Sequence, residues 1–423
     1  MDATARGRTL DRAQEVSGGP SAPRLFAATA CEPPPAQSRR DEPVTMMREL
    51  VNASLDYVVA AASYHRNDRL FPTGPSGSAT TPLGVGHGAC GVAHVLQQVR
   101  GACPARVVEW IRRRSIDASD YPPGLTQGLA GIAWTLWDLG VTDEAEKTMA
   151  MAFSHPRLLE TADVCDGISG VGLAALWMHV RTGDPFYVDR ARWLAGCLSS
   201  RAEQQDAGVC WRSADHRVRV GYGRGSSGVA AFLLYLYLAT GEWRWLQLGR
   251  RALAFDLHRA SIERGRFTDR SRHDTGGGRP ASWEHGAAGI GGVLARYYAV
   301  LGCESDQTML RAMVKQTIEW ESPDPGYFLG LAGSGQFFLD LAILCGSREA
   351  ERRAIRIGHA IASYAVRTPA GVVFASESHP DIDCGFGTGG AGVALFLHRL
   401  LATDTSSFML DELFDLQHLQ NLA

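Results

Sequence analysis

A four-residue element with glycine at both ends recurs seven times along the 423-residue chain. Successive elements begin 40, 39, 58, 61, 44 and 59 residues apart, and the elements are Gly88–Gly91, Gly128–Gly131, Gly167–Gly170, Gly225–Gly228, Gly286–Gly289, Gly330–Gly333 and Gly389–Gly392. Each one opens an apolar run, such as VAAFLLYLYL or SGQFFLDLAIL. Glycine at the start of a buried helix lets the backbone pack closely without a steric penalty. Each element therefore predicts the start of a buried inner helix.

Seven more polar segments alternate with these apolar runs. Their apolar residues recur at helical spacing, and they cover about residues 45–66, 104–114, 143–155, 187–204, 243–263, 303–320 and 347–368. We expect a further helix over 405–422 and small hairpins within 210–222 and 371–378. Helix pairs that repeat in this way form a solenoid or a closed ring, and no polar capping repeat is present. The sequence therefore predicts an all-α fold, a closed α/α toroid.

The first 45 residues differ from the rest because they are rich in Pro, Ala and Arg and show no periodicity. We interpret residues 1–45 as a disordered extension and residues 46–423 as the toroidal domain. The net charge of -3 and the absence of a basic stripe argue against nucleic-acid binding. No apolar run reaches 18 residues, and the nine cysteines are dispersed, so we expect a cytoplasmic protein without membrane or disulfide.

The residue before each first glycine lies at the start of an inner helix, where backbone N–H groups are free. These seven residues are His87, Gln127, Asp166, Arg224, His285, Leu329 and Thr388. A ring of helix N-termini suits an anionic or enolate-like group. We expect a central cavity at this end, lined by His87, Asp163, Arg224, Glu284 and His285.

The seven-fold set of glycine elements in alternating helix pairs resembles the lanthionine synthetase C-like family over about residues 46–402. The resemblance implies an (α/α)7 double toroid. It also implies an activity, since catalytic members add cysteine thiols of a precursor peptide to dehydroalanine or dehydrobutyrine and form thioether rings. Those members hold zinc with a cysteine of a Trp-Cys-x-Gly element in the fifth repeat and a Cys-His pair before glycine in the sixth.

The zinc ligands of the family are replaced in this chain. Glu284 stands at the cysteine position of the fifth repeat, in WEHG. In the sixth repeat, YFLG has Phe328 and Leu329 at the positions of the Cys-His pair. Phenyl and isobutyl groups cannot coordinate zinc. The sequence therefore predicts no metal and no other cofactor.

Other family positions match in part. Asp163 matches the aspartate of the third repeat, and Arg224 replaces a histidine expected before Gly225. Arg279 falls one residue from a family arginine. A zinc-free subset of the family is fused to kinase and lyase domains in class III lanthipeptide synthetases, and this chain carries no kinase signature. It resembles their cyclase part standing alone.

Each candidate residue also has a structural interpretation. Glu284, His285 and His87 could satisfy backbone donors at helix starts, and Asp163 could cap the third inner helix. Arg224 requires a partner at a cavity edge. We interpret Cys165 and Cys384 as small apolar residues that fill space in the core. Asp340 lies in an apolar helix, and we expect it to pair with a neighbouring side chain. Residues 264–279 are interpreted as a solvated loop or else as a docking surface for an acidic peptide.

We therefore expect a zinc-independent lanthipeptide-type cyclase, with catalytic residues among His285, Glu284, Arg224, Asp163 and His87. Its partners would be a precursor peptide and separate kinase and lyase enzymes, with no nucleic acid or membrane. Two alternatives stay open. One is a non-catalytic toroid that binds the precursor or scaffolds partner enzymes, since a fold alone does not decide activity. The other is a glycosidase that uses Glu284 and Asp163 as its carboxylate pair.

Overall fold

The computed structural model describes residues 38–74, 81–213, 215–261, 281–319, 322, 324–375, 381–402 and 409–414. The first helix begins at Ser38, earlier than the boundary at residue 45 expected from composition. The predicted disorder of residues 1–37, the predicted loop 264–279 with Arg279, and most of the predicted helix 405–422 lie outside the described residues.

Seven inner helices start at the glycine elements, as predicted. They are α2 (Ala89–Arg100), α4 (Leu129–Asp138), α6 (Ile168–Thr182), α8 (Ser226–Thr240), α10 (Ala287–Leu301), α12 (Leu331–Cys345) and α14 (Gly390–Leu401). The outer helices are α1 (Ser38–Ala60), α3 (Ala105–Arg112), α5 (Thr142–Phe153), α7 (Pro185–Ser200), α9 (Trp243–Ser261), α11 (Glu304–Glu319) and α13 (Arg348–Ala362). The inner helices are buried on most faces, whereas an outer helix such as α13 buries one stripe.

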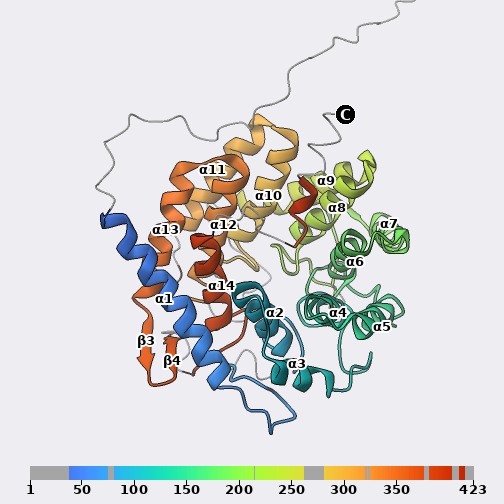
Figure 1. Cartoon of the computed structure of the whole chain (residues 1–423). Coiled ribbons are helices and arrows are strands. Elements are labelled where there is room, and N and C mark those ends of the chain that lie inside the picture. Colours follow the sequence, from blue (N-terminus) through green and yellow to red (C-terminus); the bar gives the residue numbers. More distant parts are fainter. Residues whose placement is uncertain are drawn as a thin grey trace, which may run out of the picture.

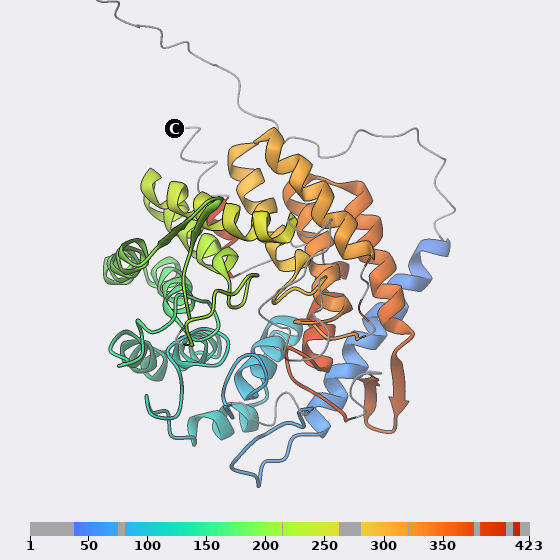
Figure 2. The ribbon, with the colours of Figure 1, turned by 180° about the vertical axis from the view of Figure 1, so that it is seen from behind.

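The inner helices form a closed ring in which each one packs against the next, and α14 packs against α2. Figure 1 shows the chain running once around this ring, with the outer helices outside it. Each outer helix from α3 to α13 packs on the inner helix that precedes it in sequence, and α1 packs on α14. Both views place α1 beside the C-terminal repeat (Figures 1 and 2), so the first helix of the chain completes the last pair.

Seven backbone hydrogen bonds close the ring at the helix starts. The second residue before each first glycine donates its N–H to the carbonyl of the equivalent residue in the next repeat. The bonds run from Gly86 to Thr126 (2.8 Å), Thr126 to Cys165 (3.1 Å), Cys165 to Gly223 (3.1 Å), Gly223 to Glu284 (2.8 Å), Glu284 to Phe328 (3.0 Å), Phe328 to Gly387 (2.7 Å) and Gly387 to Gly86 (2.7 Å). We call these residues the hydrogen-bonded ring. Its closure confirms the toroid predicted from the repeats.

The last glycine of each element is required by close backbone contact. A Cβ at Gly131 would overlap the carbonyl oxygen of Leu125, the residue three positions before the first glycine of that repeat. The same overlap occurs in all seven repeats. The missing side chain therefore lets each inner helix sit directly on the turn that carries the hydrogen-bonded ring.

Two antiparallel hairpins lie on the outer layer, close to the predicted positions. Strands β1 (Glu203–Gln205) and β2 (Gly208–Cys210) form the first, and β3 (Ala365–Thr368) and β4 (Gly371–Phe374) form the second. The second hairpin packs on α1 through β4. Within the described part of the chain, no helix combines the length and apolar character needed to cross a bilayer.

A buried ion cluster ties the C-terminal segment 409–414 to the inner helices. Arg296 of α10 contacts Asp340 of α12 and Asp411, each at 2.8 Å, and its Nε donates to the Tyr235 hydroxyl at 2.8 Å. All four side chains are buried, and removing one partner would leave an uncompensated charge. The predicted ion pair of Asp340 is confirmed.

We predict that Gly131→Ala lowers the free energy of unfolding by about 1–3 kcal/mol, because the new methyl group must displace the Leu125 carbonyl and strain the hydrogen-bonded ring. Gly196→Ala is the matched control: it lies within α7, and an added Cβ would meet no atom within 4 Å. It should stabilise the protein by roughly 0.5–1 kcal/mol through helix propensity. Urea unfolding followed by circular dichroism measures both, and equal effects would contradict the role given to Gly131.

Candidate active site

Two layers of side chains flank the hydrogen-bonded ring. The third residue before each first glycine faces the lumen of the toroid, and these residues are Val85, Leu125, Val164, Tyr222, Trp283, Tyr327 and Phe386. The last residue before each first glycine lines none of that lumen. We call this last set, from His87 to Thr388, together with the nearby side chains of Asp163 and Glu284, the rim. The ring therefore separates a polar rim from a largely apolar lumen.

Glu284 and His285 form a contact pair on the rim. Nε2 of His285 lies 3.3 Å from Oε2 of Glu284, and both side chains are 18% exposed. Burial raises the pKa of Glu284, but His285, Arg224 and His87 together outweigh burial and bring the pKa below its usual value. Glu284 is therefore a carboxylate that orients the imidazole of His285.

Cys165 lies on the other side of this carboxylate. Its Sγ is 3.9 Å from Oε1 of Glu284. Burial, and next the negative charge of Glu284, raise the pKa of the Cys165 thiol well above its usual value. Cys165 therefore stays protonated near neutral pH, since thiolates form only where positive charge outweighs burial.

Arg224 stands in the neighbouring repeat and pairs with a rim carboxylate. Its Nη1 lies 2.5 Å from Oδ2 of Asp166, and Oδ1 of Asp163 accepts the backbone N–H of Asp166 at 2.8 Å. Burial raises the pKa of Asp163 to about 6, with Asp166 adding to this shift and Arg224 opposing it. Asp163 thus supports the turn that holds the partner of Arg224.

His87 completes the rim from the first repeat. The Thr388 hydroxyl lies 3.3 Å from Nδ1 of His87 and donates to Oδ2 of Asp383 at 2.6 Å. Burial lowers the pKa of His87, while the charges of Asp383 and Glu284 oppose this shift. The ring of His87 meets the edge of Phe328 with centroids 5.9 Å apart. The contacts with Thr388 and Phe328 fix the orientation of the His87 ring.

The fold brings all five sequence-predicted residues to the rim. There the charges of Arg224 and His87 lower the pKa of Glu284, and the charge of Asp163 raises the pKa of Arg224. The cavity predicted to be lined by these five residues remains a prediction. The cavity of about 320 Å³ lies in the lumen beyond the hydrogen-bonded ring and is lined by none of them. At the rim, two shallow pockets of about 10 Å³ touch His87 in one case and Asp163 with Arg224 in the other.

The structural interpretation applies in part, because the Asp163 side chain accepts the backbone N–H of Asp166 in the turn before the third inner helix. The residues that cap the third and fifth inner helices are Gly167 and Gly286, and neither helix start receives a side-chain hydrogen bond at its cap. Sequence reasoning missed Asp383, which lies six residues before the first glycine of the seventh element.

The residues at the family's zinc positions do not fit the metal. The Phe328 ring stacks on Trp283 at a centroid distance of 5.8 Å and an angle of 9°, and it also meets Phe386 edge-on. Leu329 offers no donor atom, so Glu284 is the single oxygen ligand among the three positions. Among the described residues, no group of three or more His, Cys, Asp or Glu side chains is arranged to hold a metal ion.

Comparisons with known proteins agree with this architecture. The family model of the lanthionine synthetase C-like protein matches residues 141–413. A probable SapB synthase of Streptomyces coelicolor is 28% identical over 277 residues, which cover 65% of this chain and 29% of that relative's own length. The structure of nisin cyclase superposes with a TM-score of 0.58 at 14% identity, covering 80% of this chain and 94% of nisin cyclase, and so shares the fold. This chain belongs to the lanthionine synthetase C-like family.

Proposed function

We propose that the protein is a zinc-independent cyclase that forms thioether rings in a dehydrated ribosomal precursor peptide. One observation carries the proposal: acid, base and cationic groups gather on one rim around the contact between His285 and Glu284 at 3.3 Å. The family membership and the names of its relatives support a lanthipeptide-type substrate. Separate kinase and lyase enzymes would supply the dehydrated peptide.

The reaction needs a thiolate, and a free cysteine thiol has a pKa of about 8.5, so a modest base is enough. We assign His285 to take the thiol proton, with His87 as the second candidate base, and Glu284 to orient His285. The sulfur then attacks the β-carbon of the dehydro residue. A carbon–sulfur bond forms, and the π electrons move to the carbonyl to give an enolate.

The enolate must be stabilised and then protonated on its α-carbon. We assign Arg224 and the inner-helix N-termini to offset its negative charge, and Asp163 to position Arg224 through Asp166. The imidazolium formed in the first step, or Glu284 after it accepts a proton, returns a proton to the α-carbon. The proton lost from sulfur equals the proton gained at carbon, so the peptide mass is unchanged.

A second candidate is a non-catalytic toroid that binds the precursor peptide. The observation that favours it is the pairing of Arg224 with Asp166 at 2.5 Å, since a paired guanidinium offsets less charge on a substrate. The two candidates differ in one measurable property, because only a cyclase accelerates thiol loss.

We predict that the protein consumes free thiols of a dehydrated precursor faster than the uncatalysed reaction, without mass change. His285→Ala should lower the rate by roughly 100-fold or more through loss of the base. Arg224→Ala should lower it by a similar factor through loss of charge stabilisation. Thiol titration and mass spectrometry of the peptide measure both effects.

Gln127→Ala is the control, because Gln127 occupies the equivalent rim position in the second repeat and has no assigned role. It should leave the rate within about two-fold of wild type. Peptide binding without rate enhancement, with variants that change affinity alone, would refute the cyclase and favour the binding toroid.

We predict that the purified protein carries no stoichiometric zinc, because two of the three ligand positions hold Phe328 and Leu329. The combined variant Glu284→Cys, Phe328→Cys and Leu329→His should bind about one zinc, since the backbone bond from Glu284 to Phe328 brings these positions together. Elemental analysis measures both proteins. One tightly bound zinc per wild-type chain, lost in Glu284→Ala, would overturn the prediction.

A further inference from the structure

The lumenal cavity has the dimensions of a ligand site. Its volume is about 320 Å³, within the range of small-molecule sites. Its floor is formed by the seven lumen-facing residues, from Val85 to Phe386. Neither Glu284 nor His285 lines this cavity. It plays no part in the chemistry assigned to the rim.

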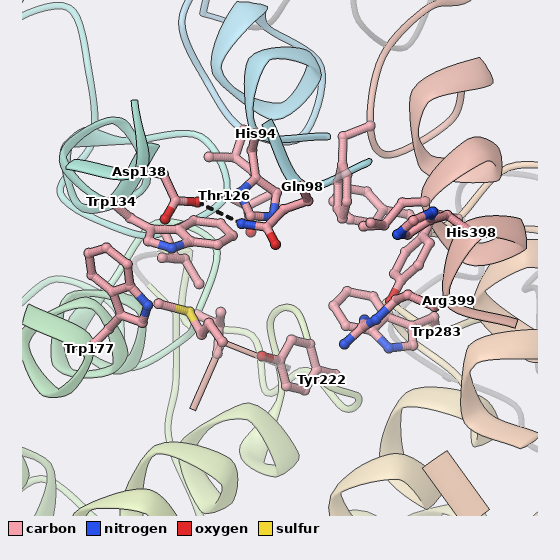
Figure 3. Close-up of a pocket in the computed structure, with 18 of the residues that line it drawn as sticks. His94, Gln98, Thr126, Trp134, Asp138, Trp177, Tyr222, Trp283, His398 and Arg399 are labelled. Atoms are coloured by element: carbon pink, nitrogen blue, oxygen red, sulfur yellow. Dashed lines mark hydrogen bonds and ion pairs between the residues drawn. The ribbon is translucent and has the colours of Figure 1, made fainter. Parts of the chain in front are cut away.

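Aromatic rings dominate this cavity. On the floor, Trp283 packs between Tyr222 and Tyr327 at centroid distances of 4.5 and 5.3 Å. Trp134 and Trp177 form part of the wall, from α4 and α6. Figure 3 shows these two indoles on one side of the cavity and Trp283 on the other. Rings arranged around an open space suit a planar aromatic ligand, which gains from both burial and ring contacts.

More basic than acidic side chains line the walls of the cavity. The two lining carboxylates already have cationic or imidazole partners: Asp138 lies 2.7 Å from Nδ1 of His94, and Glu412 lies 2.9 Å from Nη2 of Arg181. Two further basic residues, His398 and Arg399, line the opposite wall from α14. Nη1 of Arg399 also donates to Oε1 of Gln336 at 3.4 Å. Figure 3 shows Arg399 projecting into the cavity beside Trp283. The lining therefore has an excess of basic over acidic groups, which favours an anionic ligand.

The cavity opens at the end of the toroid away from the rim. At this end the Arg181 and Glu412 side chains are 44% and 37% exposed, whereas His94 and Asp138 are 11% and 15% exposed. The C-terminal segment, held by Asp411, contributes Met409 and Glu412 to the wall. A ligand entering here reaches the aromatic floor without crossing the hydrogen-bonded ring.

We propose that this cavity is a second binding site, specific for a compact aromatic carboxylate. The aromatic ring packs among Trp134, Trp177 and Trp283, and the Arg399 guanidinium binds the carboxylate. Two kinds of ligand carry an aromatic ring and a carboxylate in this arrangement: a small aromatic acid, and the C-terminus of a peptide that ends in an aromatic residue. The proposal is independent of the cyclase function, because its readout is binding and its residues lie beyond the ring.

The test is calorimetric titration of the full chain with 3-phenylpropionate and with its neutral analogue 3-phenylpropanamide. The acid should bind with a dissociation constant of roughly millimolar or tighter, and roughly 10-fold more tightly than the amide. Ala-Ala-Phe as free acid and as C-terminal amide forms the second arm. Whichever of the two free acids, 3-phenylpropionate or Ala-Ala-Phe, binds more tightly identifies the kind of ligand that the cavity takes.

Arg399→Gln should weaken binding of the preferred acid by roughly 10-fold and leave the amide within about two-fold. Trp134→Leu should weaken acid and amide alike. Two controls should leave acid and amide binding unchanged: Glu284→Gln on the rim, and Arg113→Gln, at the C-cap of α3, where the arginine is 69% exposed. The comparison of acid with amide uses the wild-type chain, so it stands even if a variant fails to fold.

Absence of saturable binding by either acid to the wild-type chain at about 10 mM would overturn the proposal, since useful sites for ligands of this size reach that range. Equal affinity for acid and amide in the wild type would also overturn it. So would undiminished acid binding by folded Arg399→Gln.

Discussion

The closed ring of seven backbone hydrogen bonds is the constraint on which the remaining structure depends. Because each repeat bonds the next through the same residue position, the ring fixes the direction of the residues on either side of it. The residue before the ring position faces the lumen, and the residue after it lies on the rim. The glycines keep this geometry by letting each inner helix rest on the turn.

This layering explains how replaced metal ligands are compatible with a retained fold. The ring uses backbone atoms, so Phe328 and Glu284 occupy ring positions without disturbing the bonds between repeats. Phe328 joins the aromatic packing around Trp283, while Glu284 becomes the centre of an electrostatic cluster with His285, Arg224 and His87. In the proposed mechanism, side-chain acids, bases and cations carry the chemistry at the rim.

The repeats predicted the inner and outer helices and the closure because glycine spacing and apolar periodicity are local properties of the sequence. They did not predict that α1 pairs with α14, since that contact joins opposite ends of the chain. His87, Arg224 and His285 were predicted from their place directly before a glycine element, and Asp163 and Glu284 from the family resemblance. Asp383 and the lumenal cavity were missed. Apolar residues such as Val85 and Trp283 look like ordinary core in the sequence, and only the ring shows that they face a common space.

The central claim is that the rim of this family member forms thioethers with side chains in place of zinc. The most direct measurement is the rate of thiol loss from a dehydrated precursor, using protein freed of metal by chelation and verified by elemental analysis. The account predicts an unchanged rate before and after metal removal, well above the uncatalysed rate. A rate that falls to the uncatalysed value and returns on addition of zinc would contradict it.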